Sequence, residues 1–230
     1  MRHRKETIII LTVSAKYNKY CVSGISKSNN KIVRIISEDE QSKYALSTND
    51  LKYKDDSHVK PLDIIEIPVK NNIPVHINSH IQTENILIDN NNYSINKIGT
   101  TNIYEVIKTY KHLFNQYEYV FGNIEYYIPE SNIKHIIPKH SLELIQVSNV
   151  KIIKITKDDN TVKSKACFIY KNKCYNMFSI TDNNYFNISE DINMKSAVLV
   201  VSLPYSPYSY SNKSEPKYYK LIAKIFDLTE

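Results

Sequence analysis

The sequence predicts a mainly β protein that consists of two consecutive small barrels. Short runs rich in Ile and Val recur along most of the chain and are bounded by clusters of Asn, Ser, Asp or Lys, which is typical of strands separated by turns. Only one segment has helical periodicity. The chain has 230 residues, of which 42% are hydrophobic, so it is long enough for two small domains that each bury a core.

The first half of the chain contains five predicted strands. They are residues 7–15, 20–26, 31–37, 62–70 and 84–89. The segment KSNNK, residues 27–31, predicts a hairpin turn between the second and third of them, because Asn tolerates positive φ.

A single main helix is expected near residues 101–115, inserted into the first barrel. The apolar residues with helical spacing are Ile103, Val106, Ile107, Tyr110 and Phe114. Either Thr101 or Asn102 supplies the N-cap.

A second β series follows an extended, proline-punctuated segment. Its predicted strands lie in residues 141–156, 164–182, 196–203 and 217–228, with a tight turn at YKNKCY in the second of these ranges. Two series of about five short strands predict OB-like barrels, while SH3-like and PUA-like barrels give similar patterns and stay as alternatives. The predicted domains are residues 1–145, which hold the first barrel and the helix, and residues 146–230.

Composition limits the classes of function. The formal net charge is +6 and the pI about 8.9, which suits an anionic partner without requiring one. The three cysteines, Cys21, Cys167 and Cys174, form no CxxC pair, so neither a disulfide framework nor a structural zinc site is expected. No stretch approaches the roughly 20 apolar residues of a membrane span. We expect a cytoplasmic protein with no membrane partner, no metal and no cofactor.

Eight pieces of the sequence occur in an order that resembles the dual OB-domain proteins of bacteria. They are ILTVSAKYNKYCVSG, KIVRIIS, PLDIIEIPVK, HIQTENILID, YSINKIG, SLELI, CYNMFSITD and VVSLPYSPY with YYKLIAKIF. In that family a Ser-x-Lys element ends a strand, Cys-x-x-Gly follows, an Arg closes the next strand and a Gln-x-Glu-Asn motif lies in mid-chain. The resemblance runs from Thr7 to about Leu228. It implies two OB-like barrels and nucleic-acid binding within bacterial conflict or defence systems, and it implies no established catalytic activity.

The segment SAKYNKYC, residues 14–21 and called the lip below, is the first candidate site. In an OB fold it is the loop between strands 1 and 2, which binds single strands together with the face of strands 2 and 3. The lysines would neutralise phosphates and the tyrosines would stack on bases. The predicted nucleic-acid-binding residues are Lys16, Tyr17, Lys19, Tyr20, Arg34 and Lys220. The structural alternative is that the lip packs the end of the barrel and its lysines are solvated.

The segment HINSHIQTEN is the second candidate site. Gln82, Glu84 and Asn85 are expected to form a polar cluster that lines a cleft, and their side chains would hydrogen-bond either base edges or neighbouring backbone. His76 and His80 are four residues apart, but the surrounding β pattern argues against a helical metal site.

Two further features have open interpretations. Cys21 would need a nearby base to act as a nucleophile, and the spacing of His58 and His112 supports none, so an enzyme is disfavoured. Tyr205 and Tyr208, with Tyr210, would form either an aromatic flap over a ligand or an irregular loop within residues 202–217.

These residues favour a non-enzymatic module that binds single-stranded or structured DNA or RNA. The resemblance implies that this module is the recognition component of a defence system with a separate protein effector. The alternative is a sensor of a small ligand such as a nucleotide, or a protein-interaction adaptor, that uses a cleft between the barrels. The first hypothesis requires Lys16, Lys19, Arg34 and Lys220 on one surface. The second requires a buried cluster of Gln82, Glu84 and Asn85.

Overall fold

The computed structural model of the chain divides into two compact units, residues 1–113 and 114–230. It describes residues 4–16, 18–74, 81–89, 94–135, 140–156, 162–209, 211 and 214–229. The boundary differs from the predicted one between residues 145 and 146, which would cut strand β8 (Leu142–Thr156). Residues 114–141 carry no long apolar run, and they belong to the second unit by their contacts.

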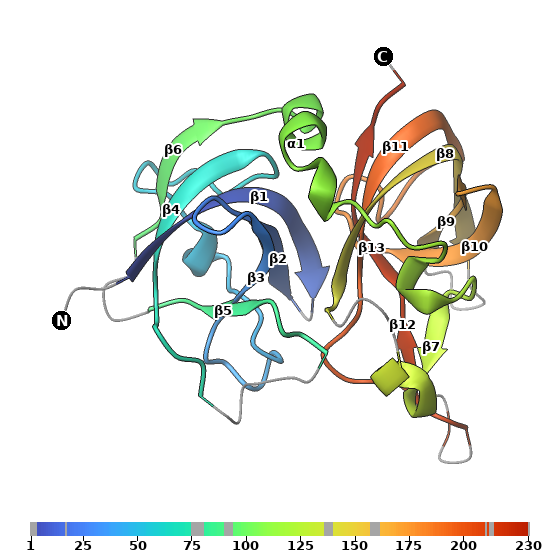
Figure 1. The fold of residues 1–230 in the computed structure, drawn as a ribbon, viewed down its shortest axis with the longest axis horizontal. Coiled ribbons are helices and arrows are strands. Elements are labelled where there is room, and N and C mark those ends of the chain that lie inside the picture. Colours follow the sequence, from blue (N-terminus) through green and yellow to red (C-terminus); the bar gives the residue numbers. More distant parts are fainter. Residues whose placement is uncertain are drawn as a thin grey trace. The chain divides into compact units, whose positions relative to one another are not determined.

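The first unit is built on a six-stranded sheet with the strand order β5-β3-β2-β1-β4-β6. Its strands are β1 (Arg4–Lys16), β2 (Lys19–Ser26), β3 (Lys31–Ile36), β4 (Asp63–Val69), β5 (Asn85–Leu87) and β6 (Asn96–Thr100). Only β3 and β5 pair in parallel. A bridge between Val69 and Ile88 joins the β4 end of the sheet to the chain after β5. The sheet therefore curls until its third and fourth strands flank the fifth (Figure 1).

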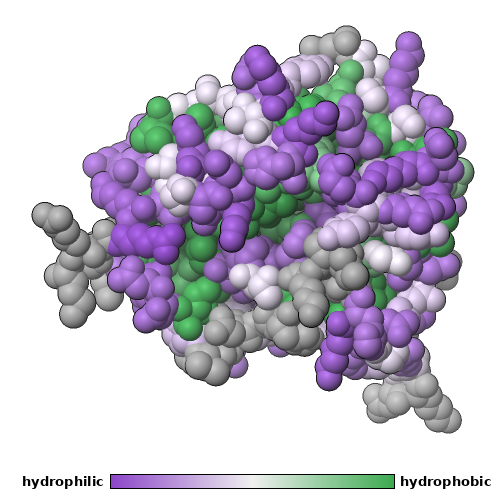
Figure 2. Space-filling view, viewed as in Figure 1, coloured by the Kyte–Doolittle hydropathy of each residue, from purple (hydrophilic) through white to green (hydrophobic). Residues whose placement is uncertain are grey.

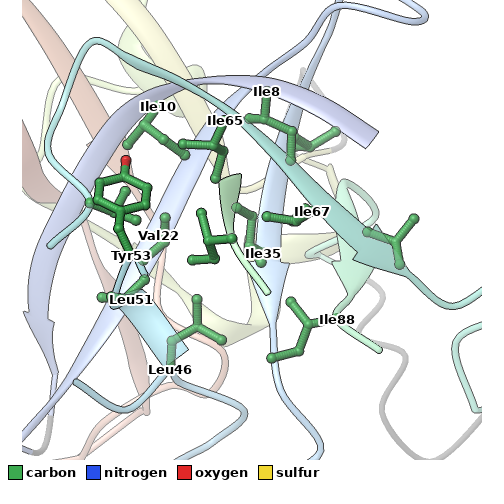
Figure 3. Packing of buried hydrophobic residues seen from close by; sticks show 14 residues of the cluster. Ile8, Ile10, Val22, Ile35, Leu46, Leu51, Tyr53, Ile65, Ile67 and Ile88 are labelled. Carbon is green, nitrogen blue, oxygen red and sulfur yellow. The ribbon is translucent and has the colours of Figure 1, made fainter. Parts of the chain in front are cut away.

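The core of the first unit is an aliphatic cluster enclosed by the curled sheet (Figure 3). Alternate residues of each strand point into it, because side chains alternate between the two faces of a strand. The cluster contains Ile8, Ile10, Val22, Val33, Ile35, Leu46, Leu51, Tyr53, Val59, Ile65, Ile67, Val69, Ile88 and Ile95. Gly24 allows β1 and β2 to approach closely, since an added Cβ would lie 2.2 Å from the backbone oxygen of Ile9.

Helix α1 (Ile103–Thr109) confirms the predicted helix but is shorter. Asn102 is the N-cap, and its side chain accepts a hydrogen bond from the backbone N–H of Glu105 at 2.9 Å. The helix ends because Tyr110 leaves the helical region, with φ −113° and ψ 29°. A 3₁₀ turn, η4 (Lys111–Leu113), follows, and a further one, η1 (Asn49–Leu51), lies before β4.

The second unit is a closed barrel with the strand order β10-β13-β11-β8-β9. Besides β8, its strands are β9 (Val162–Tyr170), β10 (Lys173–Ile180), β11 (Ile192–Ser202) and β13 (Leu221–Asp227). Strands β10 and β13 pair in parallel. Its core is aromatic, with the rings of Phe168 and Tyr175 stacked at 5.2 Å and Phe178 edge-on to both.

Each barrel uses the same pairing scheme. The first strand pairs with the second and fourth, the second with the third, and the third runs parallel to the fifth. The prediction of two consecutive OB-like barrels is thus confirmed.

The second unit also carries a two-stranded sheet that the sequence analysis missed. Strand β7 (Tyr127–Pro129) pairs antiparallel with β12 (Lys217–Tyr219). The 3₁₀ turns η5 (Val120–Gly122) and η6 (Glu130–His135) flank β7. Within the described part of the chain, no helix is long and apolar enough to span a membrane.

Candidate nucleic-acid interface

The lip forms the tight turn between β1 and β2. Lys16 pairs with Lys19 across the strands, and Asn18 adopts the positive φ of 59° that the turn needs. Tyr17 lies outside the described residues. The two lysines are therefore held at the end of a hairpin, as the sequence predicts.

Both lysines of the lip are engaged within the first unit. The ammonium group of Lys16 donates to the backbone oxygen of Lys43 at 2.7 Å, and Lys19 forms an ion pair with Asp39. Tyr20 is half-buried and packs against the aliphatic cluster, while its backbone bonds to Leu46. These contacts match the structural alternative for Tyr20 and offset part of the positive charge of the lip.

Arg34 is buried rather than displayed. Its Nε lies 3.4 Å from Oε1 of Glu84, and the two side chains are 6% and 5% exposed. The register of the sheet explains this contact. Strand β3 pairs in parallel with β5 and places Arg34 opposite Asn85, the residue that follows Glu84. The expectation that Arg34 contributes to an exposed phosphate-binding surface is therefore not met in the structure.

Lys220 is fully buried, and the expectation for it also needs correction. Its ammonium group donates to the backbone oxygens of Val120 and Asn123 at 2.6 and 2.8 Å, and to Oδ1 of Asn123 at 2.7 Å. Burial lowers the pKa of Lys220 to about 7, although Glu143 opposes this shift. Lys220 belongs to the second unit and has no surface for a phosphate.

Glu143 holds the same segment of the second unit from another side. Its carboxylate accepts hydrogen bonds from the backbone N–H of Phe121 and from Nδ2 of Asn115. Burial raises the pKa of Glu143 to about 8, and the bonds to Phe121, the charge of Lys220 and the bond to Asn115 oppose this shift. Glu143 and Lys220 thus fasten residues 115–123 to the barrel.

The predicted polar cluster is buried, as the small-ligand hypothesis requires. Gln82 and Asn85 are 6% and 8% exposed, and the Glu84 side chain is 5% exposed. The cluster is continuous with Arg34, so the structure joins one member of the predicted nucleic-acid set to this cluster instead.

The remaining candidate residues, the cysteine and the histidines, form no metal-ligand group among the described residues. Cys21 is half-buried, and no group of three or more potential metal ligands occurs in the described part of the chain. His112 faces the backbone oxygen of Asn30 at 3.3 Å. His76 and His80 lie outside the described residues.

The second unit displays an aromatic surface on the outer side of the β7–β12 sheet. Tyr219 is opposite Tyr127 in the register and therefore points to the same face, whereas their neighbours Tyr218 and Ile128 are buried. Tyr208 pairs with Lys217 through two backbone hydrogen bonds of 2.9 Å. We call Tyr126, Tyr127, Tyr208, Lys217 and Tyr219 the tyrosine ribbon.

Aromatic and cationic contacts order the tyrosine ribbon. The rings of Tyr126 and Tyr219 stack at 6.1 Å with an interplanar angle of 26°, and Tyr127 meets Tyr126 edge-on at 5.2 Å. The ammonium group of Lys217 lies 4.0 Å from the centroid of Tyr127. Tyr126 and Tyr208 are 37% and 57% exposed. This arrangement offers flat aromatic faces and one cation to a ligand at the surface.

Hydropathy alone does not single out the tyrosine ribbon. Most of the surface in Figure 2 is hydrophilic, with smaller hydrophobic areas among it. Sequence reasoning placed Tyr208 in a flap or loop and overlooked Tyr126, Tyr127 and Lys217. The available signal was the pair of tyrosine doublets, at residues 126–127 and 218–219, each beside a proline-punctuated segment.

The comparison with solved structures found similar chains. Two solved structures are similar over nearly their whole length. The Ifi202 HINa domain in complex with 20 bp double-stranded DNA is 11% identical, with 98% of this chain and 97% of that chain covered and a TM-score of 0.31. The tetrameric p202 HIN2 is 6% identical, with 99% and 96% covered and a TM-score of 0.31. No curated protein matches the chain.

The family comparison covers almost the whole sequence. The family of the dual OB-containing domain matches residues 6–225, which include every strand of both barrels apart from the first two residues of β1 and the last two of β13. This match confirms the resemblance found in the sequence. The chain belongs to the dual OB-containing domain family.

Proposed function

We propose that the protein binds single-stranded nucleic acid and that the tyrosine ribbon is its main contact surface. The observation that carries the proposal is the exposed aromatic face of Tyr126 and Tyr208 beside Lys217. Every base has a π-face, and stacking on an aromatic side chain contributes about 1–3 kcal/mol per base. The ribbon lies largely in the connection between β11 and β13, which is the loop between strands 4 and 5 of an OB fold and a common site of oligonucleotide binding.

Stacking outweighs charge in this proposal. Lys217 is the one lysine of the ribbon, and the lysines of the lip are already engaged by Asp39 and the Lys43 backbone. Each phosphate contact on a single strand adds about −0.7 to the slope of log affinity against log salt. We therefore expect a shallow salt dependence, with a slope of about −0.7 for the one contact at Lys217.

A wider role as the recognition component of a bacterial defence system, acting beside a separate protein effector, is part of the same proposal. Its support is the sequence resemblance to the dual OB-domain proteins of bacteria.

Fluorescence anisotropy with a labelled 20-nucleotide single strand tests the binding site. Tyr126→Ala and Tyr208→Ala should each weaken binding about fivefold or more, because each removes a stacking face. Tyr117→Ala is the matched control, since Tyr117 is 49% exposed in the same unit but lies outside the ribbon. A duplex of the same sequence should bind more weakly, because its bases are already stacked.

Two results would contradict the proposal. One is the absence of binding to single-stranded DNA and RNA at low salt. The other is a loss of binding in the double variant Lys16→Glu with Lys19→Glu while Tyr126→Ala and Tyr208→Ala bind like the wild type, which would place the contact surface at the lip.

A further inference from the structure

Four buried polar side chains form a row across the outer face of the first barrel. Thr12 of β1 pairs with Ser23 of β2, Ser23 with Arg34 of β3, and Arg34 with Asn85 of β5. We call these four residues the polar rung. They are 2%, 1%, 5% and 8% exposed in that order. Their strand neighbours Val22, Val33 and Ile35 belong to the aliphatic cluster, so the rung lies on the opposite face of the sheet.

Asn85 differs from the rest of the polar rung. Oγ1 of Thr12 and Oγ of Ser23 are 2.8 Å apart, and Arg34 contacts Glu84. By contrast, neither Oδ1 nor Nδ2 of Asn85 has a hydrogen-bond partner. A buried primary amide without partners is unfavourable, and native structures seldom contain one without a functional reason.

The backbone prevents Asn85 from relieving this cost by moving. Its residue pairs with Arg34 in the parallel β3–β5 ladder, and its N–H donates to the backbone oxygen of Gln82. The side chain is therefore fixed on the same face as Arg34. It presents one donor and one acceptor side by side.

Positive charge gathers next to the polar rung. Lys16 bonds to the backbone of Lys43, and the charges of Arg34 and Lys43 both act on Lys16. Burial lowers the pKa of Lys16; the Cys21 thiol opposes that shift, and the charges of Arg34 and Lys43 lower the pKa further. An anion bound beside Lys16 and Lys43 would relieve this crowding of positive charge. Glu84 would repel an anion at the other end, close to Asn85.

We propose that the first barrel binds an adenine nucleotide, with the base at Asn85 and the phosphate at Lys16 and Lys43. An asparagine amide matches the N6 amino group and the N7 acceptor of adenine in a bidentate pair. Lysine ammonium groups bind phosphate as point charges. Lys16 donates one of its three N–H groups to the Lys43 backbone, so two remain for a phosphate at the first barrel. The phosphate end of this site is its accessible part, since Lys16 is half-buried and Lys43 is exposed. This site does not depend on the tyrosine ribbon.

Isothermal titration calorimetry of the full chain with AMP, IMP and inorganic phosphate tests the site. IMP has an oxygen in place of the N6 amino group, so it cannot form the same bidentate pair. AMP should bind at least about fivefold more tightly than IMP, since a good bidentate pair discriminates between bases by that much or more. Inorganic phosphate should bind more weakly than either nucleotide.

Asn85→Leu is the decisive variant, because leucine has nearly the same shape and no polar atoms. It should lose the preference for AMP over IMP and weaken AMP binding about tenfold. The apo protein should unfold at the same temperature as the wild type or at a higher one, since the removed groups have no partners. Asn96→Leu, on β6 of the same barrel, is the matched control and should keep the affinity for AMP.

Three outcomes would overturn the proposal. AMP could fail to bind at millimolar concentration, AMP could bind Asn85→Leu as tightly as the wild type, or inorganic phosphate could bind as tightly as AMP. A lower unfolding temperature of apo Asn85→Leu would also contradict it, because Asn85 would then serve the fold through bonds that the structure does not contain.

Discussion

The two barrels share one pairing scheme but differ in how they place their buried polar groups. In the first barrel, the polar rung crosses the outer face of the sheet, and the core is aliphatic. In the second, Glu143 and Lys220 bind a neighbouring segment of chain, and the core is aromatic. The scheme thus fixes the architecture, while side chains on the outer faces and in the loops decide what each barrel can bind.

The barrels also differ in how closely their strands approach. Gly24 and Gly99 lie in strands of the first barrel, whereas Gly122, the remaining glycine of the sequence, lies outside the strands of the second. The first barrel therefore relies on a backbone contact that no larger residue permits, and the second fills its interior with rings.

Gly24→Ala should have the largest effect on stability of all the variants proposed here. A small effect would contradict the difference in strand approach between the two barrels. The new Cβ would lie 2.2 Å from the backbone oxygen of Ile9 and 2.6 Å from Cγ2 of Ile8. A clash with backbone cannot relax through a rotamer, so we expect a loss of at least about 3 kcal/mol in the free energy of unfolding of the first barrel. Hydrogen exchange should show loss of protection in β1 and β2.

Gly99→Ala is the control for this experiment. Its Cβ would meet Cδ1 of Ile64 at an ordinary 3.8 Å, so the free energy of unfolding should change by less than about 1 kcal/mol. Equal loss of protection in β8 and β9 of Gly24→Ala would show that the two barrels do not unfold separately.

The two barrels should also differ in how their stability depends on pH, because each contains a buried glutamate with a shifted pKa. The folded-state pKa of Glu143 is raised to about 8 from an ordinary 4.5. Its stabilising contribution is therefore complete below pH 4.5 and is lost as pH rises through 8. Lys220, with a pKa lowered to about 7, is protonated in both states between pH 5 and 6.5 and does not interfere there. The stability of the wild type relative to Glu143→Gln should fall by about 1–2 kcal/mol over that window.

Glu6 in the first barrel provides the opposite case. Burial alone would raise its pKa, but hydrogen bonds from Ser26, Ser28 and Arg4 outweigh burial and lower the pKa. Glu6 is ionised in both states above pH 5, so the difference between the wild type and Glu6→Gln should stay flat from pH 5 to 6.5. Urea unfolding at several pH values measures both differences, and equal slopes for the two variants would refute this assignment.

The smallest expected effect concerns the ion pair of the lip. Lys19 and Asp39 are each about one-third exposed, and exposed pairs contribute less than about 1 kcal/mol. A double-mutant cycle of Lys19→Ala and Asp39→Ala should give a coupling energy below that value, and 1 M salt should reduce it further. A coupling of several kcal/mol would mean that the lip is a rigid part of the first barrel.

The fold could be predicted from the sequence because its signals are local. Runs such as TIIILTV and SAVLVVS alternate or concentrate apolar residues, and they became β1 and β11. Strand β7 has no such run, and its partner β12 lies far along the chain, so no local pattern predicts their pairing. The same gap explains why residues 114–141 were placed with the first barrel.

The candidate sites could be predicted only in part. The motif QTEN indicated the buried polar cluster, but charge alone suggested Arg34 and Lys220 as surface residues. Lys220 is two residues from each of the buried residues Tyr218 and Ile222. Residues two apart on a strand share a face, so strand periodicity argues against an exposed position for Lys220. Its hydrogen-bond partners come from a distant segment and could not be read from the sequence.

The parallel pairing of the third and fifth strands also governs how each barrel is made. Both pairs, β3 with β5 and β10 with β13, join strands that are separated by a long stretch of chain containing the whole fourth strand. Closing such loops lowers the entropy of the chain before the stabilising contacts between the two strands form. This pairing therefore slows folding. Until the fifth strand docks, the edge of the third stays unpaired. That unpaired edge is where a strand of a neighbouring molecule can pair before the fifth strand docks.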